Sequence, residues 1–376
     1  SLIKELRNEN EVDVEWLLES TETWCKDRSV YLGLMEAISI IDGKSEKAEG
    51  AIPDILTKAL SVNFDTNVGH DYLDNAEARY DFYHLKEDKT PFDLEMLNTI
   101  TAGGVPRKSL NIVLAGTGVG KSLAMCHFAA DALSQGRNVL YITMEMAEEK
   151  IAERIDANLF DVDIATLKDL NKSAFVNKVK HINDKTQGKL IIKEYPTASA
   201  HVGHFRALLN ELKMKKKFTP DVIYIDYLNI CASSRMKGLG GSINTYSYIK
   251  AIAEEIRGLA VEFNVPIWSA TQSTRTGFGN TDVEITDTSE SFGLPATCDL
   301  MIALISTEQL EAANQVMIKQ LKNRYNDISQ HKRFCVGIDR SKMRLYDVEA
   351  SAQTLSSDEI TSAPSTPNKD FSAFKI

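Results

Sequence analysis

The chain has 376 residues, enough for two or three domains, and its 53 acidic residues outnumber its 43 basic residues to give a net charge of -10. This balance argues against a broad basic face for nucleic acid, although a narrow basic channel needs only a few cations. A hydrophobic content of 43% excludes wholesale disorder. No apolar run reaches the ~20 residues that span a bilayer, so no membrane association is expected, and the sequence contains no signal-peptide pattern.

The five cysteines lie far apart and form no C-x-x-C pair. An odd, scattered set is typical of reduced thiols in a cytoplasmic protein, so neither a disulfide framework nor a zinc site is expected. The chain begins at Ser1 without a methionine, and we expect an upstream portion to be missing.

The sequence before Pro91 predicts helices followed by a connecting segment. Apolar residues keep helical spacing from Val14 to Ile41, and a shorter amphipathic piece follows with Pro53 at a plausible first helical position. Residues 63–90 are polar and Asp-rich, which is typical of a connector. The expected divisions are a small helical N-terminal domain over residues 1–50 and a helix with its connector over residues 51–90.

Beyond Pro91 the periodicity changes to an alternation of strands and helices. Short apolar strands are expected at residues 110–115, 139–143, 190–192, 222–225, 266–270 and 300–305. Such strands, separated by helices, indicate an α/β fold with a mainly parallel sheet covered on both faces. Residues 315–348 predict a few short strands that extend the sheet antiparallel. This domain is expected over residues 91–350, and residues 351–376, rich in Ser, Thr and Pro, are expected to be a disordered tail.

A glycine-rich loop joins the first of these strands to the helix expected at Lys121 to Ser134. The loop consists of Gly116, Thr117, Gly118, Val119, Gly120, Lys121 and Ser122. It matches the P-loop consensus G-x-x-x-x-G-K-[ST] except for Ala115 in the first glycine position. The glycines let backbone N–H groups surround an anion, and the helix N-terminus adds the positive end of its dipole. Lys121 supplies a charge for the β- and γ-phosphates of ATP, and Ser122 a hydroxyl for Mg²⁺. A chance glycine-rich turn is the alternative.

Three further polar residues lie where neighbouring strands end. Asp226 closes the run 222–225, the Walker-B position that holds the metal. Glu145 follows the strand 139–143 on the ligand side of an open parallel sheet, where it can orient and deprotonate the attacking water. Gln272 ends a later strand and is placed to sense the γ-phosphate. The alternatives are an N-cap or surface aspartate, a solvent-facing glutamate and a plain strand-end glutamine.

These residues resemble the motifs of the RecA-fold ATPases, and within them those of the DnaB-type hexameric replicative helicases. The likeness rests on the P-loop and on Met144-Glu145-Met146-Ala147, Ile225-Asp226-Tyr227-Leu228 and Lys322-Asn323-Arg324. Gly50-Ala51-Ile52-Pro53-Asp54-Ile55, Val68-Gly69-His70-Asp71 and Gly293-Leu294-Pro295-Ala296-Thr297 bring it closer to the replicative helicases of T4-type bacteriophages. The resemblance implies a RecA-like core preceded by an N-terminal helical domain whose front is absent.

By this resemblance the protein is expected to be an ATP-dependent replicative DNA helicase. It implies a homohexameric ring that encircles single-stranded DNA, moves 5′-to-3′ and unwinds duplex at the replication fork. The implied cofactors are ATP and Mg²⁺, and the implied partners are a primase and a helicase loader. For a phage protein the expected location is the cytoplasm of the bacterial host.

The resemblance also implies roles for single residues. Glu145 is the catalytic base, and Arg324 is similar to the arginine finger supplied to the next subunit's nucleotide, with Lys322 beside it. Arg154 lies where family members place an arginine against the base of the nucleotide. The segment Asp54 to Val62 resembles the linker helix that docks on the adjacent subunit. The alternatives are an exposed strand-end arginine, a helix-surface arginine and a helix that packs within its own chain.

Two loops on the ligand side combine cations, glycines and small polar groups, which suits sequence-independent binding of a DNA backbone. The candidate contacts are Arg235, Lys237 and Gly238 in the first loop and Arg275, Thr276 and Gly277 in the second. Mobile surface loops are the alternative.

Two other functions are compatible with such a chain. The first is a RecA/RadA-like strand-exchange or DNA-repair ATPase, in which a filament replaces the ring. The second is a non-enzymatic assembly module with a degenerate P-loop, against which the intact Lys121, Ser122, Glu145 and Asp226 argue.

Overall fold

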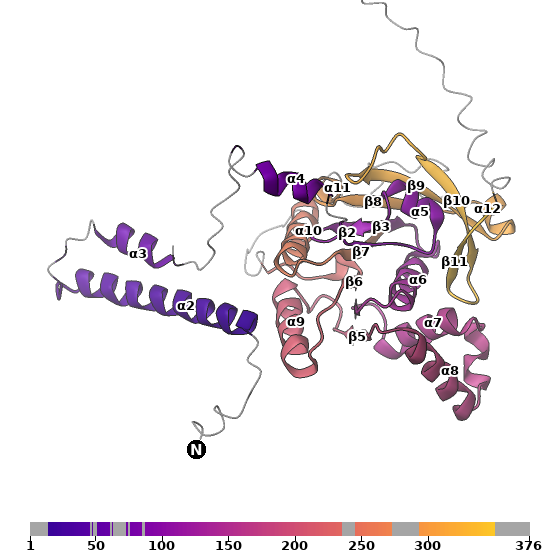
Figure 1. Ribbon diagram of the computed structural model, residues 1–376, viewed down its shortest axis with the longest axis horizontal. Helices are drawn as coiled ribbons and strands as arrows, with labels where there is room; N and C mark the ends of the chain where they lie inside the picture. Colours follow the sequence, from indigo (N-terminus) through magenta and orange to yellow (C-terminus); the bar gives the residue numbers. More distant parts are fainter. Residues whose placement is uncertain are drawn as a thin grey trace, which may run out of the picture. The chain divides into compact units, whose positions relative to one another are not determined.

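The computed structural model describes residues 14–45, 47, 51–60, 62, 73, 76–84, 87–234, 245–272 and 293–349. The chain divides into two compact units, Ser1–Lys86 and Glu87–Ile376 (Figure 1). The tail expected over residues 351–376 lies outside the described residues. In the part of the chain that is described, no helix is both long enough and apolar enough to cross a bilayer.

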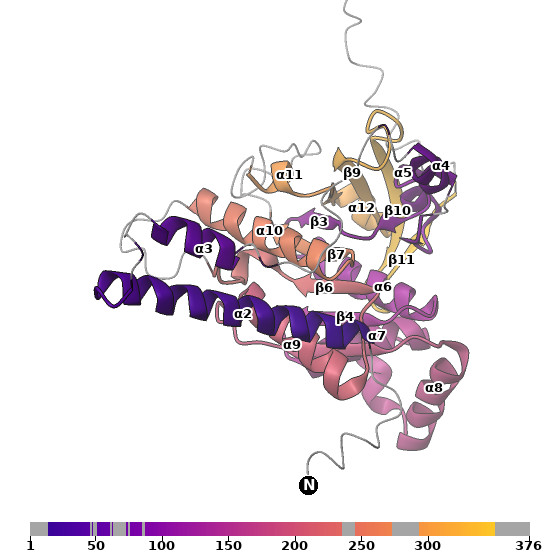
Figure 2. The ribbon, with the colours of Figure 1, turned by 60° about the vertical axis from the view of Figure 1, so that its left-hand side comes forward.

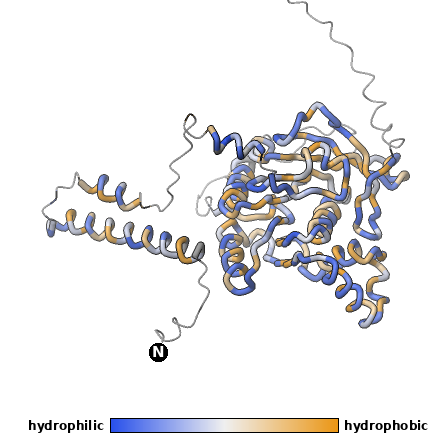
Figure 3. The backbone as a smooth tube through the Cα atoms, in the orientation of Figure 1, coloured by the Kyte–Doolittle hydropathy of each residue, from blue (hydrophilic) through white to orange (hydrophobic). Residues whose placement is uncertain are grey.

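The first unit is helical, as the apolar spacing predicted. Helix α2 spans Val14–Ile41 and helix α3 spans Ile52–Leu60. The two helices pack closely at Gly33, where a Cβ atom would lie 2.9 Å from the Cβ of Ala59. Hydrophobic residues recur along the whole of α2 (Figure 3), and ten of its large hydrophobic side chains are exposed.

Helix α4, Ala76–His84, lies within the segment that the sequence predicted to be a connector. Its residues are mostly polar and aromatic and form no apolar stripe, so the periodicity that revealed α2 and α3 gave no signal here.

The second unit is built on a nine-stranded sheet. The strands are β3 (Leu110–Ala115), β4 (Val139–Thr143), β5 (Leu190–Glu194), β6 (Val222–Asp226), β7 (Ile267–Gln272), β8 (Leu300–Ile305), β9 (Gln315–Asn323), β10 (Arg333–Asp339) and β11 (Arg344–Asp347). Their order is β11-β10-β9-β8-β3-β7-β6-β4-β5, with β3 to β8 parallel and β9 to β11 antiparallel. The predicted α/β fold and its antiparallel extension are confirmed. A separate two-stranded sheet pairs β1 (Lys89–Thr90) with β2 (Val105–Pro106).

Helices cover both faces of the large sheet (Figures 1 and 2). One face packs against α5 (Glu95–Ile100), α6 (Lys121–Ser134) and α7 (Glu148–Phe160), and the other against α9 (Val202–Lys216) and α10 (Thr245–Glu262). Successive residues of β3 alternate between the two cores, with Val113 in the first and Ile112 in the second. Among the described residues of this unit, the other helices are α8 (Lys172–Lys185), α11 (Gly293–Thr297), α12 (Glu308–Ala312) and the 3-10 turns η2 (Ile164–Asp169) and η3 (Leu228–Ile230).

The strand register defines two edges of the sheet that matter for the site. At the carboxyl edge of the parallel strands, Ala115 of β3 lies beside Gln272 of β7, and Thr143 of β4 lies beside Asp226 of β6. At the amino edge, Leu300 of β8 is paired with Asn323, the last residue of the antiparallel β9. The five steps between the six residues of β3, at about 3.3 Å each, separate the edges by roughly 17 Å.

Candidate active site

The P-loop connects β3 to α6 at the carboxyl edge of the sheet. Gly118 and Gly120 adopt φ values of 79° and 131°, which side chains other than glycine rarely tolerate. These turns bring the loop over the N-terminus of α6, which begins at Lys121 as predicted. Val119 donates its N–H to the carbonyl of Gly116 at 3.3 Å and packs its side chain against the core.

A cavity of about 300 Å³ lies over this loop. It is lined by Gly116, Thr117, Gly118, Gly120, Lys121, Ser122, Leu123, Glu145, Arg154, Gln272, Arg340 and Met343. The structure therefore brings together most of the residues that the sequence predicted to bind and cleave nucleotide. Of the P-loop residues named from the sequence, Val119 does not line the cavity.

Lys121 lies at the base of the cavity with its side chain 9% exposed. Its Nζ atom is 3.2 Å from Oε2 of Glu145, 4.0 Å from Oδ1 of Asp226 and 3.3 Å from the centroid of the Tyr227 ring. A lysine held between two carboxylates is a fixed positive charge, placed where the phosphates of a nucleotide over the P-loop would lie.

Asp226 is fully buried behind Lys121. Its Oδ2 atom accepts a hydrogen bond from the Tyr141 hydroxyl at 3.1 Å, whereas Oδ1 has no hydrogen-bond partner among the described residues. Burial raises the pKa of this carboxyl group, and the nearby charge of Lys121 counteracts the rise. A buried carboxylate oxygen without a hydrogen-bond donor is costly unless a cation completes it, so Asp226 and the Ser122 hydroxyl fit a divalent metal.

Arg340 is a residue of this site that sequence reasoning missed. It lies in the turn between β10 and β11, and its guanidinium donates to the carbonyl oxygens of Gly118 at 3.1 Å and Val119 at 3.4 Å. The turn is tied to the end of α7, because Asn158 donates to the carbonyl oxygen of Met343 at 2.7 Å. In the sequence, Arg340 is recognisable only as part of a basic turn between two strands, and such a turn does not by itself predict a nucleotide-binding residue.

Lys322 and Arg324 lie at the other edge of the sheet, away from the P-loop of their own chain. The Nη1 atom of Arg324 donates to Oδ1 of Asp299 at 2.9 Å. Lys322 donates to the carbonyl oxygen of Ala296 at 3.0 Å, and burial lowers the pKa of this lysine. Arg324 and Arg257 line a second cavity, of about 410 Å³, on this side of the fold.

The candidate DNA contacts fall outside the described residues. Arg235, Lys237 and Gly238 belong to residues 235–244, and Arg275, Thr276 and Gly277 belong to residues 273–292. Both segments follow strands, β6 and β7, that end at the same edge as the P-loop.

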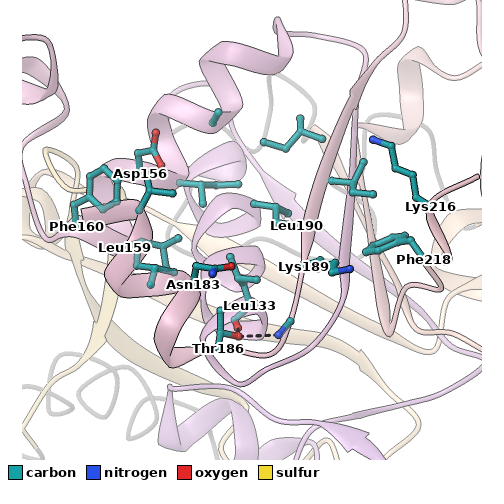
Figure 4. A pocket seen from close by; sticks show the side chains of 17 residues that line it. Leu133, Asp156, Leu159, Phe160, Asn183, Thr186, Lys189, Leu190, Lys216 and Phe218 are labelled. Atoms are coloured by element: carbon teal, nitrogen blue, oxygen red, sulfur yellow. Dashed lines mark hydrogen bonds between the residues drawn. The ribbon is translucent and has the colours of Figure 1, made fainter. Parts of the chain in front are cut away.

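A third, apolar cavity of about 500 Å³ lies beside the edge strand β5 (Figure 4). Leu159 and Phe160 of α7, Val179 and Ile182 of α8, and Leu190 of β5 are among its lining residues. No side chain of the described α8 is buried, and Val176 and Val179 are 52% and 43% exposed. Burial raises the pKa of Asp156, on the wall of this cavity, to about 6.

A P-loop after β3, a buried aspartate that ends β6 and an acidic residue after β4, the neighbour of β6, lie on one parallel sheet and define a P-loop ATPase of the RecA-like class. Residues 90–343 match the family described as DnaB-like helicase C terminal domain. The chain is 42% identical over 372 residues to the DnaB-like replicative helicase of Enterobacteria phage T4, covering 96% of this chain and 78% of that protein. It is 26% identical over 218 residues to the replicative DNA helicase DnaB of Helicobacter pylori, covering 57% of this chain and 43% of that protein.

Solved structures agree with the fold. The structure of a DnaB-like replicative helicase and its interactions with primase superposes with a TM-score of 0.63 at 14% identity, over 88% of this chain and 78% of that one. A second solved structure, described as an ATPase domain, superposes with a TM-score of 0.61 at 16% identity, over 74% of this chain and 100% of that one. The chain belongs to the DnaB-like replicative helicase family and is an ATP-hydrolysing helicase. The comparisons give no support to the strand-exchange alternative.

Proposed function

We propose that this helicase works as a homohexameric ring in which each ATP is cleaved between two copies of the chain. The observation that carries the proposal is the placement of Arg324 and Lys322 at the sheet edge opposite to the P-loop. Because roughly 17 Å of β3 separate the two edges, Arg324 cannot serve the nucleotide of its own chain. A neighbouring copy can receive it, and such an arginine finger accelerates hydrolysis ~10³–10⁵-fold.

Within one chain, the polar residues at and behind the P-loop cavity divide the chemistry of hydrolysis among them. Lys121 binds the β- and γ-phosphates, and Glu145, 3.2 Å from it, takes the proton of the attacking water. Ser122 and Asp226 would hold Mg²⁺, which supplies positive charge to the phosphate oxygens. Gln272, beside Ala115 in the sheet, couples the γ-phosphate to the loop that follows β7.

Arg154 completes the cavity from α7. A guanidinium group can stack on the base of the nucleotide, and we assign that contact to Arg154.

We assign the linker role to α3 and place its docking site in the apolar cavity between α7, α8 and β5 of an adjacent copy. Helix α3 offers Ile52, Ile55, Leu56 and Leu60, and Leu60 is 72% exposed even though α3 packs against α2. The exposed Val176 and Val179 of α8 offer a complementary apolar surface that would otherwise face water. The alternative is that α3 packs only within its own chain. If a charged substitution at Val179 leaves ring assembly unchanged, this alternative is favoured.

In the ring, single-stranded DNA is held by residues 235–244 and 273–292, through Arg235, Lys237, Gly238, Arg275, Thr276 and Gly277. Translocation runs 5′-to-3′, and opening duplex requires ~1.4 kcal/mol per base-pair step, which hydrolysis supplies. We further propose a primase and a helicase loader as partners, in the cytoplasm of the bacterial host; the primase is supported by the solved relative described with primase.

Mixed rings test the shared active site. Lys121→Ala and Arg324→Ala should each abolish DNA-stimulated ATP hydrolysis. When the two variants are mixed, some interfaces combine an intact P-loop from one chain with an intact Arg324 from the other, so partial activity should return. No recovery in rings shown by native mass measurement to contain both variants would contradict action between subunits.

A further inference from the structure

The amino edge of the sheet carries a charged cluster built around Asp299, which immediately precedes β8. The side chain of Asp299 is 7% exposed. Its Oδ1 atom accepts from Nη2 of Arg257 at 2.7 Å and from Nη1 of Arg324 at 2.9 Å, and its Oδ2 atom accepts from the backbone N–H of Leu110 at 3.0 Å. One buried carboxylate thus holds two arginines from different parts of the chain, Arg257 of α10 and Arg324, the residue after β9.

The backbone fixes this carboxylate on both sides. The N–H of Asp299 donates to the carbonyl of Leu110 at 2.8 Å, and the carbonyl of Asp299 accepts from the N–H of Arg324 at 3.0 Å. The backbone of Asp299 is therefore hydrogen-bonded both to Leu110 of β3 and to Arg324, the residue that its side chain also binds. A residue locked by such contacts positions its partner better than an exposed acid on a loop.

The sharing leaves Arg324 only partly engaged. The fork of a guanidinium usually binds both oxygens of a carboxylate, but Oδ2 is occupied by Leu110 and Oδ1 is shared with Arg257. Arg324 bonds to Asp299 through Nη1, and its side chain is 48% exposed. The bond uses only part of the donor capacity of the guanidinium, and two arginines on one carboxylate leave the cluster with excess positive charge.

We propose that Asp299 and Arg257 are positioning residues for Arg324. Asp299 fixes the direction of the Arg324 guanidinium, and Arg257 takes up half of the Asp299 charge so that Arg324 stays available to the phosphates of the neighbouring copy. This inference rests on the proposed role of Arg324 between subunits.

Asp299→Asn tests the inference, because the amide keeps the shape of the side chain and removes its charge. A displacement of about 1 Å in a catalytic group costs about a hundredfold in rate, so kcat for DNA-stimulated hydrolysis should fall about tenfold to a hundredfold. KM for ATP should change less than about twofold, because the P-loop of the same chain lies at the opposite edge. The matched control is Glu262→Gln, which breaks an exposed ion pair with Arg206 (2.7 and 2.8 Å). This substitution should change neither kcat nor KM.

Two further measurements separate positioning from a general loss of structure. Mixed rings of Asp299→Asn and Lys121→Ala should regain activity, since the P-loop of the first and the Arg324 of the second are intact. In an Arg324→Ala background, Asp299→Asn should have no further effect on the slow basal hydrolysis that remains without DNA stimulation. An additional fall there, or no recovery in confirmed mixed rings, would overturn the inference.

Arg257→Gln provides a second variant if Asp299→Asn does not fold, because Arg257 is 34% exposed on the surface of α10. Arg257→Gln should lower kcat about threefold to tenfold, because Asp299 would then pair with Arg324 alone and neutralise its charge. Wild-type turnover would refute the proposal that Arg257 and Arg324 share the Asp299 carboxylate. If Arg324→Ala is fully active, the proposed function of Arg324 is wrong. If Arg324→Ala is inactive and Asp299→Asn is fully active, only the role of Asp299 is overturned.

Discussion

Arg340 links the β10–β11 turn to the P-loop, and replacing it by glutamine should weaken ATP binding. Its Nη1 atom donates to the carbonyl of Gly118 at 3.1 Å, and its Nη2 atom contacts the carbonyl of Val119 at 3.4 Å. These bonds tie two carbonyls of the P-loop to the β10–β11 turn at the wall of the cavity, and so limit the conformations open to the loop. Loss of Arg340 therefore frees a loop that must be ordered again when nucleotide binds.

The size of the effect follows from the geometry. Hydrogen bonds that involve a charged group contribute ~1.5–3 kcal/mol, but the Val119 contact is long and Arg340 is exposed to solvent. We therefore expect about 1 kcal/mol for Arg340→Gln after allowing for solvent screening. Since about 1.4 kcal/mol corresponds to a tenfold change in Kd, the Kd for ATP should rise about fivefold.

The assay is equilibrium binding of a fluorescent ATP analogue, followed by steady-state hydrolysis. KM should rise with Kd, whereas kcat at saturating ATP should stay within about twofold of wild type. Arg344→Gln is the matched control, because Arg344 lies on the same hairpin and pairs with Asp161 at 3.0 Å instead of with the P-loop. Wild-type Kd in Arg340→Gln, or an equal loss in Arg344→Gln, would refute the assignment.

Three other changes have expected outcomes. Glu145→Gln should keep ATP binding and ring assembly but abolish turnover, measured by phosphate release; wild-type turnover would remove Glu145 as the base. Val179→Asp, on the exposed side of α8, should leave monomer unfolding unchanged and shift native mass from rings to smaller species, unless α3 docks elsewhere. Burial raises the pKa of Asp156 to about 6, so the folded chain binds this proton more tightly than the unfolded chain and loses stability as pH rises from about 4 to about 6. Asp156→Asn should therefore raise the free energy of unfolding at pH 7 by about 1 kcal/mol after discounting for solvent and flatten that pH dependence in urea titrations; an unchanged profile would contradict it.

The local elements were largely predictable from the sequence. Strand β3 and helix α6 begin and end where their apolar pattern and the flanking glycines indicated, because a buried strand and its following helix carry their signal within a few residues. Helix α4 was missed because its polar surface has no periodicity. The predicted extent of β5 was short by two residues, since its polar end, Lys193 and Glu194, is held in the sheet by pairing with Ile142 and Thr143 of β4.

The phosphate-binding half of the site was encoded in one contiguous stretch, from Gly116 to Ser122, and the sequence by itself determined it. The tertiary structure alone decided that Arg340, 219 positions after Lys121, reaches the same loop. It also decided that Arg324 lies at the opposite edge, bound to Asp299. The physical reason is that strand order and antiparallel pairing depend on how the whole sheet buries its apolar residues. A local sequence pattern predicts that a segment forms a strand but does not specify which distant strand it will pair with.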